Sequence, residues 1–227
     1  MSSFSGKTAI VTGSTQGLGE TTARLLVERG LSKIIITGRN ETRGKTVVDD
    51  LNRTGCEAHF VPADLQEVNA CRSIVTEART RFNQVDILVN TAGLTSRGTI
   101  FDTSVELWDQ LMAVNLRAPF ILTQDCVNWM RETMTKGSVV NVISTSAYGG
   151  QPFLTPYSTS KGGLATLTKN VAYAVVRNQI RVNGLMLGWM DTPGEDIIQR
   201  TNHTDGQDWL EEAEADRPFG RLIKAEE

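Results

Sequence analysis

The sequence predicts an α/β fold in which a doubly wound, mostly parallel sheet carries helices on both faces. Short β-branched or apolar runs alternate with longer stretches whose apolar residues recur at helical spacing. The short runs are almost continuously apolar, as strands buried on both faces must be. A glycine-rich segment joins the first run to the first helical stretch. The chain therefore begins as a strand, a turn and a helix of the kind that builds such a sheet.

Each expected element rests on its own run of residues. Runs such as 34–37, Ile-Ile-Ile-Thr, are typical of strands, and the longer stretches between them have helical apolar spacing. The strands are expected at 8–12, 34–37, 58–61, 85–89, 138–143 and 180–183. The helices are expected at 18–29, 41–52, 68–82, over most of 104–134 and at 157–177. Residues 188–216, rich in Asp, Glu and Gln with two tryptophans, are interpreted as a substrate loop or helical lid.

The length and composition favour one globular domain over residues 1–227, because no linker divides the 227 residues. The 23 basic and 26 acidic residues give a net charge of −3, which argues against nucleic acid and anionic membranes as partners. No run approaches the roughly 20 apolar residues that span a bilayer. Three cysteines without C-x-x-C spacing fit a reducing compartment. We therefore expect a cytoplasmic protein. With two widely separated histidines, we expect no metal site.

The segment after the first strand is suited to bind a dinucleotide in a Rossmann-like fold. It reads Thr12-Gly13-Ser14-Thr15-Gln16-Gly17-Leu18-Gly19. Glycines allow a tight turn and close approach to a pyrophosphate, and the following helix offers free N–H groups and the positive end of its dipole. The alternative is an ordinary strand-to-helix turn. The context favours nucleotide binding.

The end of the second strand favours NADP over NAD. An acidic residue near this point holds the ribose 2′-hydroxyl in NAD-binding folds, whereas an arginine accommodates a 2′-phosphate. Here the strand ends Gly38-Arg39-Asn40, without a carboxylate. Alternatively, Arg39 is a solvated surface charge and Glu41 reaches the ribose, so that NAD remains possible.

Tyr157 and Lys161 form the clearest chemical signal, because residues four apart share one face of a helix. A phenol with a pKa of about 10 is a poor base near neutrality. A neighbouring ammonium favours the phenolate and is expected to lower the pKa of Tyr157.

Several motifs in the expected order resemble those of the short-chain dehydrogenase/reductase family over nearly the whole chain. Residues 12–19 resemble the family's T-G-x-x-x-G-x-G turn, and Asn90, Ala92 and Gly93 match its N-N-A-G segment, with Thr91 replacing one asparagine. Asp64 and Leu65 resemble the pair that contacts adenine. The catalytic tetrad of the family is matched by Asn115, Ser144, Tyr157 and Lys161.

The resemblance implies an oxidoreductase that interconverts a secondary alcohol and a carbonyl by hydride transfer. Tyr157 exchanges the substrate proton, and Ser144 bonds the same oxygen, although Thr145 and Ser146 are neighbouring hydroxyls. Lys161 and Tyr157 also hold the nicotinamide ribose, and Asn115 anchors a water in a proton relay. The resemblance also implies a dimer or tetramer formed through 104–134 and 157–177.

Two features depart from the family pattern. The family has Pro-Gly where this chain has Leu187-Gly188, while Thr192 keeps the position of the threonine that bonds the carboxamide. Residues 217–222 resemble a segment that normally precedes a further helix and a seventh strand. We therefore expect the final edge strand to be missing. Either the chain is truncated, or a partner or neighbouring segments cover the edge.

The segments 94–97, 145–154 and 188–212 are expected to wall the substrate pocket. They are rich in hydrogen-bonding side chains, which favours a small sugar, polyol or oxo compound over a steroid. Ser144, Tyr157, Gln151 and Trp189 are the expected substrate contacts. The alternative is a nucleotide-sensing or regulatory protein that keeps the fold without turnover.

Overall fold

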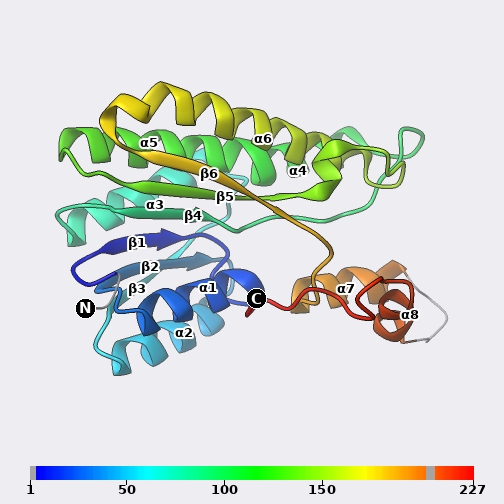
Figure 1. Ribbon diagram of the computed structural model, residues 1–227, viewed down its shortest axis with the longest axis horizontal. Coiled ribbons are helices and arrows are strands. Elements are labelled where there is room, and N and C mark those ends of the chain that lie inside the picture. The colour runs from blue at the N-terminus through cyan, green and yellow to red at the C-terminus, as the bar shows by residue number, and fades with distance from the viewer. Residues whose placement is uncertain (1–3, 203–207) are drawn as a thin grey trace.

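The computed structural model describes residues 4–202 and 208–227 and confirms the predicted fold class. Six parallel strands form one sheet in the order β3-β2-β1-β4-β5-β6 (Figure 1). The order reverses between β1 and β4, and the carboxyl ends of the strands at such a point bind ligands in open α/β sheets. The strands are β1 (Thr8–Val11), β2 (Lys33–Gly38), β3 (Glu57–Pro62), β4 (Ile87–Asn90), β5 (Ser138–Ser144) and β6 (Arg181–Leu187).

The helices form a layer on each face of the sheet. The helices are α1 (Gly17–Glu28), α2 (Glu41–Arg53), α3 (Val68–Arg81), α4 (Val105–Met112), α5 (Ala118–Glu132), α6 (Thr155–Val175), α7 (Pro193–Asn202) and α8 (Trp209–Ala215). Helices α1 and α2 lie on one face, and α3, α5 and α6 lie on the other (Figure 1). Ile34 and Ile36 are buried on the α1 and α2 side, while Ile35 is buried on the α3 and α5 side. This alternation explains why the middle of β2, Ile34 to Ile36, is continuously apolar.

Most expected boundaries are shifted by one or two residues in the structure, and three elements differ in ways that have a structural cause or a larger extent. The strand expected at 85–89 begins at Ile87, because the carboxylate of Asp86 accepts from the backbone N–H of Thr8 and pairs with Lys7. The strand expected at 180–183 begins at Arg181 and continues to Leu187. The helical stretch within 104–134 is divided by a π-helical turn, Ala113–Arg117, between α4 and α5.

Strand β6 forms one edge of the described sheet, in agreement with the expected absence of a seventh strand. Leu185 of this strand is 49% exposed, so part of the face opposite α6 is open. The segment after β6 leaves the sheet and forms α7 and α8 beyond the carboxyl ends of the strands (Figure 1). Much of the expected lid is therefore helical, while residues 203–207 lie outside the described part.

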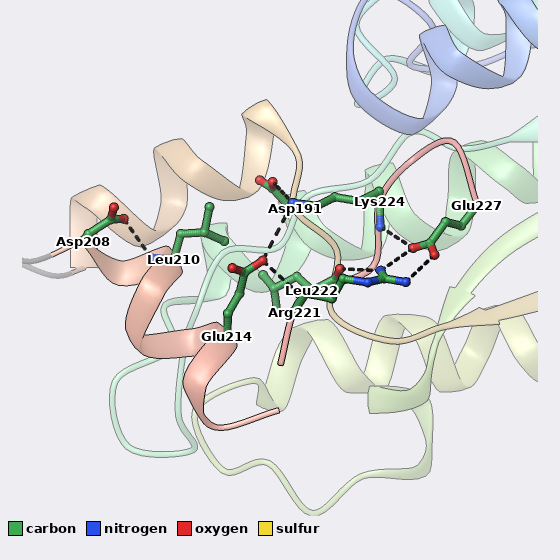
Figure 2. Close-up of polar contacts among 8 residues, drawn as sticks. All are labelled: Asp191, Asp208, Leu210, Glu214, Arg221, Leu222, Lys224 and Glu227. Carbon is green, nitrogen blue, oxygen red and sulfur yellow. Dashed lines mark hydrogen bonds and ion pairs between the residues drawn. The ribbon is translucent and has the colours of Figure 1, made fainter. Parts of the chain in front are cut away.

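The segment 217–227 turns back and contacts the loop between β6 and α7. Ile223 exchanges backbone hydrogen bonds with Trp189 and Asp191, at 3.1 and 3.0 Å. The ammonium of Lys224 lies 2.8 Å from a carboxylate oxygen of Asp191, while Arg221 pairs with Glu227 (Figure 2). This segment therefore holds the loop that carries Thr192.

The described residues contain no helix that is long and apolar enough to cross a membrane. Over the same residues, no group of three or more His, Cys, Asp or Glu side chains is placed to hold a metal ion. Cys56, Cys71 and Cys126 are free and buried, and burial raises the pKa of Cys56 and Cys71 to about 11. These thiols remain protonated near neutrality.

Candidate active site

The glycine turn is fixed between the ends of its neighbouring strands. The hydroxyl of Thr12 accepts hydrogen bonds from the backbone N–H groups of Thr91 and Ala92, each 3.1 Å long. Gly13 has φ +63°, and a Cβ atom there would lie 2.9 Å from the Cα of Ala92. Glycine is therefore required for both conformation and close packing. Thr91, the departure from the family pattern, donates from its hydroxyl to the carbonyl of Thr12.

The N-terminus of α1 is free to bind an anion. Gln16 occupies the N-cap position, but its side chain does not cap α1 within the described structure. It accepts a hydrogen bond from Arg43 of α2 instead. The first N–H groups of a helix need partners, and a phosphate oxygen supplies them.

A cleft of about 740 Å³ runs from this turn to the end of β2 and to α7. Most of the predicted cofactor residues line it, namely Gly13, Thr15, Gln16, Gly17, Leu18, Gly19, Arg39, Asp64, Leu65, Ala92, Gly93 and Thr192. Tyr157 and Lys161, at the start of α6, are not among the residues that line it, and Ser14 and Asn90 have structural contacts instead. The Ser14 hydroxyl donates to the carbonyl of Val11, and the Asn90 amide donates to Asn141. The cleft and its free helix end fit a dinucleotide.

Ser144 and Tyr157 bring two hydroxyl groups together where β5 ends and α6 begins. The Ser144 hydroxyl accepts from the backbone N–H of Ser146, 3.1 Å away, which leaves its own proton free to donate. Burial raises the pKa of Tyr157, a hydrogen bond with Ser144 lowers it, and the charge of Glu195 raises it further. The net direction is upward, so the expectation that the pKa of Tyr157 would be lowered is wrong for this structure. Burial outweighs the favourable contact.

Lys161 lies next to Tyr157 in the protein interior. Its ammonium is 5.8 Å from the centroid of the Tyr157 ring and donates to the carbonyl of Val142, 2.9 Å away. The residue is only 4% exposed, and burial lowers the pKa of Lys161 to about 8. A buried ammonium that has further N–H donors beside the one bonded to Val142 is suited to bind ribose hydroxyls.

Asn115 lies in the π-helical turn and is fully buried. It exchanges two hydrogen bonds with the backbone of Leu94, 2.8 and 2.9 Å long, and donates to the hydroxyl of Ser160 at 3.1 Å. A Cβ atom built on Gly93 would lie 3.5 Å from both Asn115 Oδ1 and Lys161 Nζ. The predicted tetrad residues are therefore brought to one region, and Gly93 keeps space open between two of them.

The loop after β6 contributes polar groups to the far wall of the cleft. The Thr192 hydroxyl accepts from the N–H of Glu195 in the first turn of α7. The Trp189 indole donates to Glu195 at 2.8 Å and packs with Trp209, with ring centroids 6.1 Å apart. Trp189 thus anchors the lid. Gln151, another of the predicted substrate contacts, is exposed on the loop between β5 and α6.

Arg43 extends the set of residues predicted for the site, whereas Glu195 belongs to the segment 188–212 expected to wall the pocket. Arg43 lines the cleft one helical turn after Arg39, a spacing that the sequence shows. Glu195 accepts hydrogen bonds from residues far apart in the chain, Trp189 and Thr95. Only the folded chain shows that these distant residues meet at Glu195.

Comparison with known proteins assigns the chain to a family. The family model for short chain dehydrogenases matches residues 7–203, so the chain belongs to this family of oxidoreductases. An uncharacterized oxidoreductase of Thermotoga maritima is 35% identical over 99% of this chain and 87% of its own length. A cyclopentanol dehydrogenase of Comamonas sp. is 33% identical over 82% of this chain and 74% of its own. The F189W actinorhodin polyketide ketoreductase with NADPH has a TM-score of 0.87 and 30% identity, and the match covers 97% of this chain and 86% of that one.

Proposed function

We propose that this oxidoreductase interconverts a secondary alcohol and a carbonyl by hydride transfer, with Tyr157 as the acid and base. The observation that carries the proposal is the convergence of the Tyr157 and Ser144 hydroxyls beside buried Lys161. A nicotinamide cofactor bound in the cleft would supply the hydride. The protein would orient the reactants and stabilise charge on the reacting oxygen.

The chain's own groups suit the proton transfer. In reduction, Tyr157 donates its proton to the carbonyl oxygen while Ser144 donates a hydrogen bond to the same atom. Because burial raises the pKa of Tyr157, the phenol keeps its proton near neutrality and acts first as an acid. The ammonium of Lys161 stabilises the resulting phenolate. This attraction between opposite charges is stronger because both groups are shielded from water. Asn115 holds the backbone of Leu94 and the Ser160 hydroxyl around this region.

We propose NADP as the preferred cofactor. Arg39 and Arg43 line the cleft at the end of β2, and within the described residues neither is paired with a carboxylate. Glu41, the alternative ribose ligand, lies 3.6 Å from Lys45 and does not line the cleft. Two guanidinium groups fit a phosphate, and the related ketoreductase structure contains NADPH.

The proposed substrate is a small alcohol or carbonyl compound, and the proposed assembly is a homo-oligomer. Polar residues of the loop after β4 and of α7 meet at the cleft, as the Thr95 and Glu195 pair does. Phe101, Val105 and Phe120 are exposed on or beside α4 and α5. Exposed apolar groups of this kind favour association through these helices. No observation favours a non-catalytic nucleotide sensor.

A carbonyl panel tests the proposed function. Purified protein is mixed with NADPH or NADH and with sugars, oxo acids and ketones, while loss of the reduced cofactor is followed by absorbance. Turnover by the wild type and its loss in Tyr157→Phe support the proposal. Cofactor binding without turnover of any compound, together with identical behaviour of the two proteins, contradicts it.

A further inference from the structure

Arg97 is held beside the segment that leads into the candidate active site. The neighbouring residue Gly98 forms two backbone hydrogen bonds, from its N–H to the carbonyl of Phe153 and from the N–H of Thr155 to its carbonyl, 2.9 and 3.0 Å long. Thr155 begins α6, two residues before Tyr157. The loop after β4 is therefore tied to the start of the catalytic helix, and Arg97 has a fixed backbone position there.

Within the part of the chain that the structure describes, the Arg97 guanidinium contacts neutral groups. It donates to Gln199 Oε1 at 2.8 Å and lies 5.5 Å from the centroid of the Phe153 ring. Among the described residues, no carboxylate lies within 4.0 Å of it. A guanidinium carries five N–H donors, and one of them is bonded here. The remaining donors and the positive charge are available to a ligand.

A chain of hydrogen bonds leads from Arg97 through Gln199 to Glu195. Gln199, which is 2% exposed, donates to Glu195, and Glu195 also accepts from Trp189 and Thr95. Both oxygens of Glu195 are thus bonded to neutral donors, and the Gln199 amide lies between this carboxylate and Arg97. The charge of Glu195 contributes to the raised pKa of Tyr157, and the hydrogen bonds of Gly98 tie the loop that carries Arg97 to the start of α6.

The charged groups beside the start of α6 favour an anion. Lys161 and Arg97 are cationic, Glu195 is anionic, and Asp191 is neutralised by Lys224 at 2.8 Å. A charge-assisted pair with a planar guanidinium is strong and has a defined geometry. The Phe153 ring supports the guanidinium without competing for its donors.

We propose that Arg97 binds an anionic group of the substrate, a carboxylate or a phosphate, carried by the molecule whose carbonyl meets Tyr157. The inference rests on the proposed carbonyl reduction and adds the charge of the substrate to it. A neutral sugar, polyol or ketone leaves the positive charge of Arg97 without a counter-charge. An oxo acid or an oxo phosphate ester satisfies them.

Matched probes test this site by comparing compounds that differ in charge. The values of kcat/KM are measured for acetoacetate against its ethyl ester, and for dihydroxyacetone phosphate against dihydroxyacetone. The proteins are the wild type, Arg97→Met, Arg97→Lys and the control Arg72→Met, which changes an exposed arginine of α3. In Arg97→Met, kcat/KM for the preferred anionic probe should fall by about 50-fold, the loss expected for a hydrogen bond to a charged group. The neutral partner should change less than threefold, Arg97→Lys should recover part of the loss, and Arg72→Met should match the wild type.

The pair of probes that shows the effect identifies the anionic group as a carboxylate or a phosphate. Equal use of charged and neutral probes by the wild type, or equal losses for both in Arg97→Met, overturns the anion site while carbonyl reduction stands. Calorimetric titration of the same probes provides a readout without turnover. If no probe is reduced, the proposed function fails, and binding of an anion that disappears in Arg97→Met still supports the site. Absence of that binding overturns it.

Discussion

The side-chain amide of Asn115 donates a hydrogen bond to the hydroxyl of Ser160, 3.1 Å away, and thereby joins the π-helical turn to the residue directly before Lys161. The same amide group binds the backbone of Leu94. One buried side chain therefore connects the loop after β4, the turn before α5 and the catalytic helix α6. Such π-helical turns are frequent at functional sites.

Replacing Asn115 with alanine should destabilise the protein as well as reduce activity. The change removes three hydrogen bonds and leaves the N–H and carbonyl groups of Leu94 without these partners, while the Ser160 hydroxyl still donates to the carbonyl of Tyr157. We expect a loss of about 3 kcal/mol in the free energy of unfolding. Urea titration measures it, with Asn128→Ala on the exposed side of α5 as the control. A loss below that of the control would show that Asn115 does not join these segments.

Replacing Lys161 with methionine should abolish activity but stabilise the fold. Burial lowers the pKa of Lys161 from 10.5 to about 8. At about 1.4 kcal/mol per pKa unit, desolvation of this ammonium costs about 3 kcal/mol. The lost hydrogen bond to Val142 offsets about 1 kcal/mol of the gain. Denaturation at pH 7 should therefore show a variant that is about 2 kcal/mol more stable.

The pH dependence of that difference has a defined sign. Because the pKa of Lys161 is lower in the folded protein, the unfolded chain binds more protons between pH 8 and 10.5. The wild type gains stability with rising pH through this window, and the difference from Lys161→Met becomes smaller. A difference that stays constant from pH 7 to pH 10 would mean that the ammonium is not desolvated.

Arg39 and Arg43 should determine the preference for NADPH. In Arg39→Ala and in Arg43→Ala, the Kd for NADPH should rise by about tenfold, as expected for loss of one phosphate contact, while the Kd for NADH stays unchanged. Fluorescence titration measures both constants. Arg53→Ala, at the far end of α2, is the matched control. Equal effects on the Kd for NADPH and for NADH would show that these arginines do not recognise the 2′-phosphate.

The apolar contact of Leu222 should hold the C-terminal segment more firmly than its ion pairs do. Leu222 is buried in a small core with Trp209 and Ala213, whereas Lys224 and Asp191 are partly exposed. Leu222→Ala should cost about 3 kcal/mol locally, and Lys224→Met less than about 1 kcal/mol. Hydrogen exchange at 188–192 should rise strongly in the first variant only. A larger rise in hydrogen exchange in Lys224→Met than in Leu222→Ala would show that the ion pair, rather than the apolar contact, holds the segment.

The sequence predicts the fold well because its signals are local. Apolar runs such as Ile34 to Ile36 read as buried strands, and the glycines after Thr12 mark the turn. The length of β6 is harder to predict, because Gly184 interrupts the apolar pattern. In the structure a Cβ atom there would lie 2.4 Å from Ile143 Cδ1, so Gly184 leaves room for the Ile143 side chain of β5.

The site is less predictable, because its energetics depend on burial and on distant contacts. The motif of Tyr157 and Lys161 shows which groups meet, but not that desolvation raises the pKa of the phenol. The row from Arg97 through Gln199 to Glu195 joins residues about one hundred positions apart. Their meeting depends on the path of the loops rather than on sequence spacing.

Single-turnover oxidation of NADPH by a reducible carbonyl compound, followed from pH 6 to 11 in the wild type and in Tyr157→Phe, tests the role of Tyr157 most directly. The wild-type rate should fall at alkaline pH as the phenol loses its proton. The variant should be about 10³-fold slower, the usual effect of losing a general acid, with no such fall and with NADPH binding retained. A variant within tenfold of the wild type, with the same pH profile, would contradict the assignment of Tyr157 as the proton donor.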